Sequence, residues 1–520
     1  MKRSNWSGRP DKSHNEGIGG VHDQETRRRF TDKFMMDAVN LVTEQGNSIS
    51  EAAWRLGGAQ RTGSSVSQAV AYPFSVILEN FKMTKIHNAG AEVTANGGTT
   101  QGFSPDLLTA IRERFYHVDY CPFTGKRIFF ENAGGSLTLK AVVERGAEVA
   151  SIPDNEHRDN PASRAISRIV VEGRQALATL FGPNDEEGVI FGGETGTECL
   201  FRLIRSASMA APTGGSVVAC ELEHPATFDA TAQWARRTNR SWLKVPFNTA
   251  SGCVTAEDYA LVIRPDTRVA TIIHTSPVTG MVQDVTGIAQ AIRSISPECY
   301  IIVDGIQHAP HGALDVAAYG ADGYVISLYK IFCRFNNGYA WVSPRLSTVA
   351  HDRLSGKSDD AWELGSRDPS ALAGADEMVK YLEWLGGHFT DSSSRRERIV
   401  AAGQAMHEHE QAMVARLIEG TKSLAGLRSL PGVRLIGEGD SPSREGVVSF
   451  AVEGIDAKQV VAYMGERGIR VHARSDDVFS GNILRPLGLT SVTRISLAHY
   501  NAPSEIDECL LVLGTMLAES

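Results

Sequence analysis

Short apolar runs alternate with amphipathic stretches along the chain from about residue 127 onward. Several runs are continuously apolar, which is the pattern expected of strands that are covered on both faces. Between them, apolar residues recur with helical spacing at 196–209, 225–238 and 284–295. This alternation predicts an α/β fold with a mostly parallel sheet wrapped by helices. The predicted strands are RIFFEN (127–132), GVIFGG (188–193), SVVACEL (216–222), VATIIHT (269–275), YIIVDG (300–305) and GYVIS (323–327).

A smaller α+β unit is expected after the large domain, which we place at residues 104–394. The small C-terminal domain, residues 395–520, is predicted to begin with a long amphipathic helix over 396–425. A strand at VVSFAVEG (447–454), a helix over 457–467, another strand and a terminal helix complete it.

The N-terminal part has a different texture. Residues 1–26 are polar and charged, so we expect them to be disordered. Residues 27–58, from RRRFTDKF to SISEAAWRLGG, resemble the first two helices of the helix-turn-helix in insertion-sequence transposases. The recognition helix of such a module would occupy 59–72, where glycines and serines stand and no aromatic-basic face is present. We interpret the segment as a remnant, joined by a linker over 59–103 to an enzyme whose native start is, by hypothesis, Met83.

Composition limits the class of protein. The 520 residues are 42% hydrophobic and 22% charged, as in a soluble globular protein, and the net charge of −9 does not favour a nucleic-acid surface. No apolar run approaches the roughly 18 residues of a membrane helix, and the polar start is no secretory signal. The seven cysteines show no CxxC or paired spacing, so we expect a reduced, cytoplasmic protein without structural disulfides and predict no metal site.

Asp304 and Lys330 carry the strongest chemical signal. Asp304 ends an apolar strand, at the edge where open α/β sheets bind ligands. A carboxylate there needs a hydrogen-bond donor such as a protonated pyridine nitrogen. The alternative interpretation is that Asp304 caps a following helix. Lys330 follows the apolar run ISLY, and burial in such a setting lowers the pKa of an amine. The alternative interpretation is a lysine at a strand end whose amine extends to solvent. One lysine for an imine and one carboxylate for a pyridinium are what pyridoxal 5'-phosphate (PLP) requires.

Two further motifs fit the same cofactor. In FGGETGTE, Thr195, Gly196 and Thr197 lead straight into a helix, whose free N–H groups can face a phosphate, although helix capping explains these residues equally well. His224, in ELEHPAT, follows a buried strand, where its flat ring could stack on an aromatic cofactor. A histidine satisfied within the core is the alternative for His224.

In this order, the four motifs resemble the class V aminotransferase and cysteine desulfurase family of fold-type-I PLP enzymes. The likeness covers roughly residues 104–517. It extends to FFENAGGS (129–136), SPVTGMVQDV (276–285), WELGS (362–366) and TRISLAHYNAPSEID (493–507). The resemblance implies a large PLP-binding domain, a smaller C-terminal domain, and a homodimer with the active site at the subunit interface.

The resemblance also implies roles for individual residues. Lys330 would form the Schiff base, Asp304 would hold the pyridine nitrogen and His224 would stack on the ring, and these three are the predicted catalytic residues. Arg494 corresponds to the arginine that binds the substrate carboxylate, for which a forked guanidinium is suited. The remaining predicted cofactor contacts are Thr195, Gly196, Thr197, Gln307 at the phenolic oxygen, Ser327, Tyr329 in place of the family's histidine, and Ser366, which would reach the neighbouring subunit.

The chain departs from cysteine desulfurases where their nucleophilic cysteine lies. The matching stretch, residues 471–488, contains no cysteine, and Cys509 comes after Arg494 in the terminal helix. A persulfide mechanism is therefore disfavoured. Pro277 replaces the family's substrate-side asparagine. Candidate specificity residues, for which a solvated loop is the alternative, are Asn155, Glu156, His157, Arg158, Arg334 and Asn336.

We therefore predict a PLP-dependent enzyme of class V aminotransferase type that acts on an amino acid. The sequence leaves open whether it is a transaminase or a lyase that breaks a C–S or another bond. The alternative is a DNA-binding regulator in which the PLP fold serves as a sensor domain. The acidic net charge of −9 and the missing recognition helix argue against that alternative.

Overall fold

The computed structural model describes residues 102–182, 188–437 and 442–519. The predicted disorder at 1–26, the helix-turn-helix-like segment at 27–58 and nearly all of the linker at 59–103 lie outside the described residues. The described residues all belong to one compact unit.

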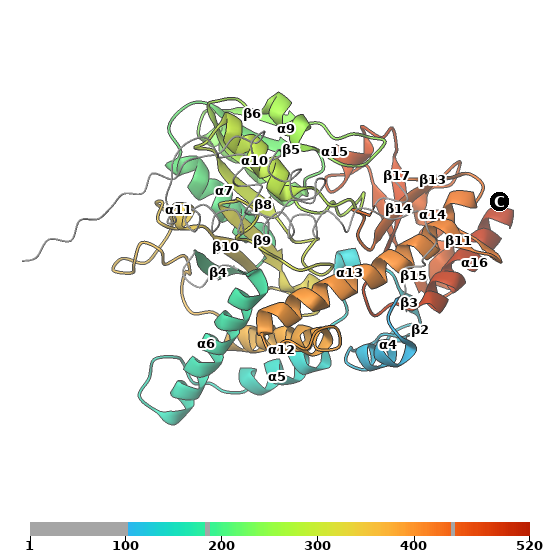
Figure 1. Cartoon of the computed structure of the whole chain (residues 1–520), viewed down its shortest axis with the longest axis horizontal. Coiled ribbons are helices and arrows are strands. Elements are labelled where there is room, and N and C mark those ends of the chain that lie inside the picture. Colours follow the sequence, from blue (N-terminus) through green and yellow to red (C-terminus); the bar gives the residue numbers. More distant parts are fainter. Residues whose placement is uncertain (1–101, 183–187, 438–441, 520) are drawn as a thin grey trace, which may run out of the picture. The chain divides into compact units, whose positions relative to one another are not determined.

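A seven-stranded sheet forms the centre of the large domain (Figure 1). Its order is β4-β10-β9-β8-β7-β5-β6, and β10 alone runs in the direction opposite to the other six strands. The prediction of a mostly parallel α/β sheet is therefore confirmed. The strands are β4 (Val189–Gly193), β5 (Ser216–Cys220), β6 (Ser241–Val245), β7 (Thr267–Ile273), β8 (Tyr300–Asp304), β9 (Gly323–Ser327) and β10 (Gly338–Val342).

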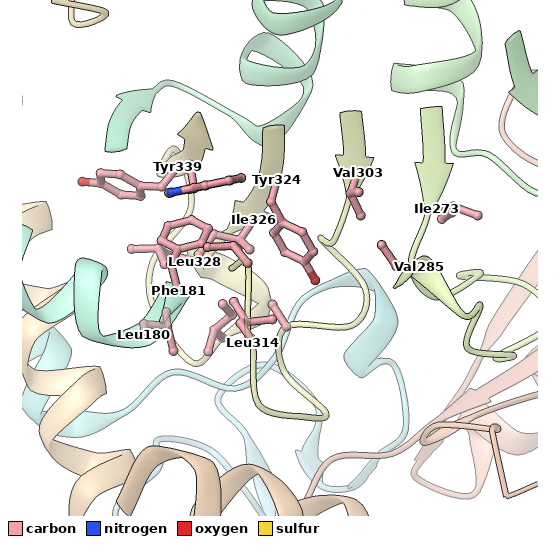
Figure 2. Close-up of a cluster of buried hydrophobic side chains, with 14 of the residues drawn as sticks. Leu180, Phe181, Ile273, Val285, Val303, Leu314, Tyr324, Ile326, Leu328 and Tyr339 are labelled. Carbon is pink, nitrogen blue, oxygen red and sulfur yellow. The ribbon is translucent and has the colours of Figure 1, made fainter. Parts of the chain in front are cut away.

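Helices cover both faces of this sheet, because its central strands are apolar on both sides. One face, which includes Ile302 and Val325, packs against α7 (Gly196–Ala210) and α8 (Pro225–Arg237). The opposite face presents Val303 of β8 with Tyr324 and Ile326 of β9 (Figure 2). The helices on that face are α6 (Pro161–Phe181), α9 (Ala256–Val262), α10 (Val285–Ile295) and α12 (Pro369–Gly386).

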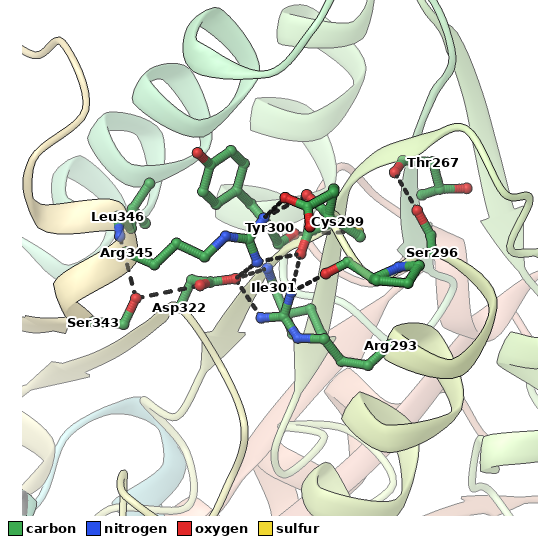
Figure 3. A network of polar contacts seen from close by, with 12 residues as sticks. Thr267, Arg293, Ser296, Cys299, Tyr300, Ile301, Asp322, Ser343, Arg345 and Leu346 are labelled. Carbon is green, nitrogen blue, oxygen red and sulfur yellow. Dashed lines mark hydrogen bonds and ion pairs between the residues drawn. The ribbon is translucent and has the colours of Figure 1, made fainter. Parts of the chain in front are cut away.

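Asp322 links the amino ends of β8 and β9. Its buried carboxylate accepts hydrogen bonds from the backbone N–H of Ile301 at 2.9 Å, from Arg293 at 2.7 Å and from Ser343 at 3.2 Å (Figure 3). A carboxylate buried this deeply requires such donors. Because parallel strands place all their amino ends at one edge, this network fixes strand register at the edge opposite their carboxyl ends.

A four-stranded antiparallel sheet with the order β13-β14-β17-β16 forms the centre of the small domain. Its strands are β13 (Val433–Leu435), β14 (Val447–Val452), β16 (His472–Ser475) and β17 (Ser491–Ser496). It packs with α13 (Arg395–Glu419), α14 (Ala457–Glu466) and α16 (Pro503–Glu519) around a separate apolar core. This arrangement agrees with the expected α+β unit.

The remaining elements are short or peripheral. None of the helices in the described part of the chain combines the length and apolar character needed to cross a membrane. The short or peripheral elements are α4 (Pro105–Arg112), β1 (Tyr120–Cys121), β2 (Gly125–Lys126), β3 (Ile128–Phe129), α5 (Lys140–Ala150), α11 (Pro344–Ser347), β11 (Gly420–Thr421), β12 (Leu424–Ala425), β15 (Ile469–Arg470) and α15 (Gly481–Leu484).

Three local expectations from the sequence were wrong. Of the strand predicted at 127–132, only Ile128–Phe129 forms a strand, β3. It pairs with β15 because Ile128 is buried in the small-domain core. The helix predicted over 396–425 ends at Glu419, because Gly420 adopts a positive φ of 78°. Strands β6 and β10 were not predicted at all, and β6 is partly exposed, which leaves no continuous apolar run to detect.

Candidate active site

A cavity of about 220 Å³ lies where the carboxyl ends of parallel strands meet. Asp304 ends β8 and Ser327 ends β9, while loops after other parallel strands contribute the rest. This is the edge at which open α/β sheets bind ligands. All the predicted catalytic and cofactor residues except Ser366 line it together. The lining residues are Thr195, Gly196, Thr197, His224, Ile273, Thr275, Pro277, Asp304, Ile306, Gln307, Ser327, Tyr329, Lys330 and Phe335.

The amine of Lys330 projects into this cavity from a short 3-10 turn that follows β9. Only 8% of the residue is exposed, and Nζ donates to the Ala133 carbonyl at 2.9 Å and to Oε1 of Gln307 at 3.2 Å. Burial, helped by the positive charges of Arg494 and Arg474, lowers the pKa of Lys330 to about 7. A neutral lysine amine is a nucleophile, so the chain presents a reactive group here.

Asp304 is held by donors on both carboxylate oxygens. Oδ2 accepts from the hydroxyl of Thr227 at 3.0 Å, and Oδ1 accepts from the backbone N–H of Ile306 at 3.1 Å. Burial raises the pKa of Asp304, against the opposing effects of these hydrogen bonds and of Lys330. The bond from Ile306 is a local turn contact, and a turn rather than a helix follows Asp304. A cationic ring nitrogen would suit this carboxylate better than its present partners.

The beginning of α7 supplies a site for an anion. Thr195 caps the helix, since its side chain accepts from the backbone N–H of Glu198 at 3.1 Å. The first N–H groups of a helix lack partners within the helix, so those of Gly196 and Thr197 are available to a phosphate. A Cβ on Gly196 would lie 2.5 Å from Oγ of Ser327, which explains why a glycine stands at this close approach.

His224 is an uncharged ring at the wall of the cavity. Its Nδ1 accepts from the backbone N–H of Ala226 at 3.1 Å, at the start of α8. Burial, together with the charges of Lys330, Arg474 and Arg494, lowers the pKa of His224 to about 3. The ring therefore stays neutral, as stacking on an aromatic cofactor requires.

Gln307 belongs to a buried chain of hydrogen bonds that sequence reasoning did not find. Its Nε2 lies 3.1 Å from Nε2 of His311, and Nδ1 of His311 lies 2.7 Å from Oε2 of Glu410 on α13. Against the opposing effect of burial, the carboxylate of Glu410 raises the pKa of His311. In the form of His311 that carries its proton on Nδ1 alone, Nδ1–H donates to Glu410 and Nε2 accepts from Gln307, whose Oε1 is turned toward Lys330. The i, i+4 spacing of Gln307 and His311 was the available sequence signal.

Arg494 reaches the cavity indirectly. It is 2% exposed, and its Nη1 donates to the carbonyl of Pro277, a lining residue, at 2.9 Å. Its Nε is buried without a hydrogen-bond partner among the described residues. Burial and the neighbouring Arg474 lower the pKa of Arg494 to about 9. An anionic group would supply the acceptor that this guanidinium lacks.

Several candidate residues do not reach the cavity of their own chain. Ser366 lies in a second hollow of about 530 Å³, together with residues 155–158. Arg334 instead donates to Ser370 at 3.1 Å, and Asn336 occupies a turn with φ of 64°. None of the described cysteines lines the cavity, and Cys509 is buried in the small-domain core.

Three contributors near the cavity were also missed from the sequence. Thr227 holds Asp304 from one turn beyond His224, within the quoted ELEHPAT motif. Thr275 lines the cavity with a buried hydroxyl that has no partner among the described residues. Burial and the nearby Asp304 raise the pKa of the fully buried Glu223 well above its usual value, which favours the uncharged form of its carboxyl group.

The groups around the cavity fit PLP. A neutral lysine can join its aldehyde, a buried carboxylate can hold its ring nitrogen, and the helix start can bind its phosphate. The close approach at Gly196 leaves backbone rather than side chain facing the anion site. Fold and site together define a PLP-dependent enzyme of fold type I.

Comparison with known proteins gives the family. The aminotransferase class-V family model matches residues 128–358 and 401–509. An aminotransferase-like protein from Gibberella zeae is 27% identical, over 75% of this chain and 95% of the relative. A probable cysteine desulfurase from Xylella fastidiosa is 25% identical, over 74% of this chain and 90% of that one. A cysteine desulfurase-like protein from Aspergillus flavus is 25% identical, over 79% and 91%.

Solved structures share the fold. The cysteine desulfurase of Thermococcus onnurineus superposes with a TM-score of 0.67 at 20% identity, covering 81% of this chain and all of that one. The Escherichia coli cysteine desulfurase CsdA gives a TM-score of 0.65 at 21% identity, covering 81% and 99%. The chain belongs to the aminotransferase class-V family and is a PLP-dependent enzyme that acts on an amino acid. Nothing in these matches supports the DNA-binding alternative.

Proposed function

We propose that Lys330 is the lysine that holds PLP and that the enzyme carries out a transamination or an elimination without a catalytic cysteine. The observation that carries this proposal is the cavity in which the amine of Lys330 and the carboxylate of Asp304 are buried together beside the start of α7. Lysine, carboxylate and helix start each match one reactive or charged part of the same cofactor.

Bound PLP supplies an electron-poor ring that stabilises negative charge at the Cα atom of an amino acid. The chain's own residues do the rest. Lys330, with a pKa lowered to about 7, would remove the proton from Cα at neutral pH and release it to a different atom, as both transamination and elimination require. Asp304 would hold the positive charge of the cofactor's ring nitrogen in place. Arg494 orients the substrate by binding its carboxylate.

The positions of the cysteines support a reaction that needs no persulfide. Six of the seven are buried, and none lines the cavity. A thiol buried in apolar surroundings is a poor nucleophile, and burial raises the pKa of Cys509 to about 12. The six buried cysteines carry free thiols, which supports a cytoplasmic location, where thiols stay reduced.

We further propose a homodimer in which Ser366 completes the partner's phosphate site. Ser366 lies in the second hollow, apart from the cavity of its own chain. The apolar side chains of Leu354 and Leu364, in the same segment, are 55% and 51% exposed. Exposed leucines in one segment are typical of a surface that another chain covers.

The test is chemical trapping. The purified protein should be yellow with PLP, lose its colour on borohydride reduction, and yield a peptide in which Lys330 carries the cofactor. Lys330→Ala should abolish trapping, whereas Lys380→Ala, on the exposed side of α12, should not change it. A wild-type protein that stays colourless, or trapping at another lysine, contradicts the proposal.

Product analysis separates the two reactions. After incubation with an amino acid, accumulation of pyridoxamine phosphate indicates transamination. Release of ammonia together with a keto acid indicates elimination.

A further inference from the structure

A second arginine lies beside Arg494 on the same face of the small sheet. In the antiparallel pair β16–β17, His472 stands opposite Arg494 and Arg474 stands opposite Val492. Directly opposed residues share a face, and so do residues two apart on one strand. Arg474 and Arg494 are therefore diagonal neighbours, with His472 between them on that face.

Each of the two guanidiniums has a buried donor without an acceptor among the described residues. Arg474 donates from Nη2 to the carbonyl of Phe479 at 3.0 Å, and Arg494 donates from Nη1 to Pro277 at 2.9 Å. The Nε atoms of both are buried with no hydrogen-bond partner among the described residues. Buried donors of this kind are ordinarily satisfied, so an acceptor is missing at each arginine.

The nearby acidic groups are already engaged. Glu131 accepts from Arg470 at 2.5 Å and lies 3.1 Å from His472. Glu223 is fully buried, and burial raises its pKa well above the usual value, which favours the uncharged carboxyl group. Asp477, whose charge acts on Arg474, is exposed and accepts from the backbone N–H of Phe479 at 2.8 Å. The two arginines thus leave an excess of positive charge at this side of the site.

The positive charges of the two arginines act on His224 and Lys330. Arg474 and Arg494 both contribute, after burial, to the lowered pKa of His224 and of Lys330. Arg474 is not among the residues that line the cavity, but its charge acts on both of these groups, and the hydrogen bond from its Nη2 to Phe479 is exposed. A substrate with a single carboxylate would use Arg494 and leave Arg474 without a partner.

We propose that Arg474 binds a second anionic group, so that the substrate is an amino acid with a negatively charged side chain of carboxylate or sulfinate type. The inference rests on the proposed function, in which Arg494 binds the α-carboxylate. Arg474 is then the residue that determines specificity for the side chain. Its planar fork matches such a group through two donors.

Matched substrates and ligands test the inference on the PLP-loaded enzyme. We expect kcat/KM for aspartate or glutamate to exceed that for asparagine or glutamine by about 10- to 100-fold, as charge-assisted hydrogen bonds allow. Succinate should bind about 10-fold or more tightly than butyrate in calorimetry, a readout that needs no turnover. Arg474→Gln should remove both preferences, mainly through KM, and Arg474→Lys should keep part of them.

A charge control comes from the same loop. Arg485 is paired with Asp476 at 2.7 Å, and 65% of its side chain is exposed, so Arg485→Gln should leave the acid preference intact. Equal binding of succinate and butyrate to the wild type, or equal loss of both in Arg474→Gln, overturns the inference. A yellow enzyme with trapped Lys330 but no acid preference leaves the proposed function standing, whereas a colourless protein removes its basis.

Discussion

Lys330 shows how a few neighbours change one side chain from a surface cation into a nucleophile. A lysine amine usually titrates near 10.5, and burial with Arg494 and Arg474 nearby lowers this pKa to about 7. Asp304 acts in the opposite direction but does not outweigh them. The consequence is an amine that is largely neutral just above pH 7.

The first prediction concerns the attachment of PLP to cofactor-free protein. A protonated amine cannot attack an aldehyde, so the rate of colour formation should rise with pH, with a midpoint near 7. Arg474→Gln removes one charge that lowers the pKa, so its midpoint should move upward. Stopped-flow absorbance over pH 5.5–10 checks both, and a wild-type midpoint near the usual lysine value of about 10.4 contradicts the prediction.

The second prediction separates charge from hydrogen bonding at Asp304. Asp304→Asn keeps the shape but removes the charge, so kcat should fall by about 100-fold or more, as expected for the loss of a charged hydrogen bond of about 3 kcal/mol. Thr227→Val removes only the neutral donor to Oδ2, so a loss of about fivefold, or about 1 kcal/mol, is expected. Steady-state kinetics compare the two, and similar losses would assign Asp304 a purely structural role.

At the scale of elements, the sequence predicted those strands whose own residues form a recognisable apolar pattern. Strands β8 and β9 were placed within a residue because they are continuously apolar, and their ends located Asp304 and Lys330. Strand β6, with the sequence SWLKV, was missed because it lies at the sheet edge with exposed positions, which leaves no apolar run to detect.

Contacts between distant segments could not be predicted from the sequence. Glu410 lies 99 residues from His311, and nothing in either segment indicates the other. Thr227 is 77 residues from Asp304, and Ala133 is 197 residues from Lys330. Residues that end strands are found by pattern, while their supporting partners depend on how elements pack.

The third prediction concerns the chain of hydrogen bonds between α13 and the turn after β8. Glu410→Ala removes the acceptor of a buried histidine, which costs about 3–5 kcal/mol of unfolding free energy. Glu410→Gln keeps an oxygen in place, so its loss should be smaller. Thermal denaturation of the variants and the wild type measures the order.

The pH dependence of that loss follows from His311. Its pKa is raised in the folded protein above the unfolded value of 6.5, against burial, by Glu410. Stability from a raised pKa is fully present below the unfolded value and is lost as pH rises through the folded one. The difference in melting temperature between wild type and Glu410→Gln should therefore be larger at pH 6 than at pH 9. A difference that grows with pH contradicts this assignment.

At the scale of the whole molecule, one chain does not bring all the expected site residues together. The cavity holds the lysine, the carboxylate and the helix start, while Ser366 lies in the second hollow. The family resemblance could suggest a partner subunit, because the WELGS motif stands where the family's interface residues lie. The structure of a single chain does not contain that contact.

The fourth prediction tests the shared site by mixing two inactive variants. Lys330→Ala lacks the reactive amine, and Ser366→Asp places a negative charge where we propose the partner's phosphate binds, so each homodimer should be inactive. In a mixed dimer, one site combines the intact Lys330 of the Ser366→Asp chain with the intact Ser366 of the Lys330→Ala chain. Co-refolded mixtures should therefore regain activity, up to about one quarter of the wild type for random pairing of twofold-symmetric dimers. If Ser366 acted within its own chain, the mixture would stay inactive, and if it had no role, Ser366→Asp alone would be active. Only a site built from two chains predicts inactive parents and an active mixture.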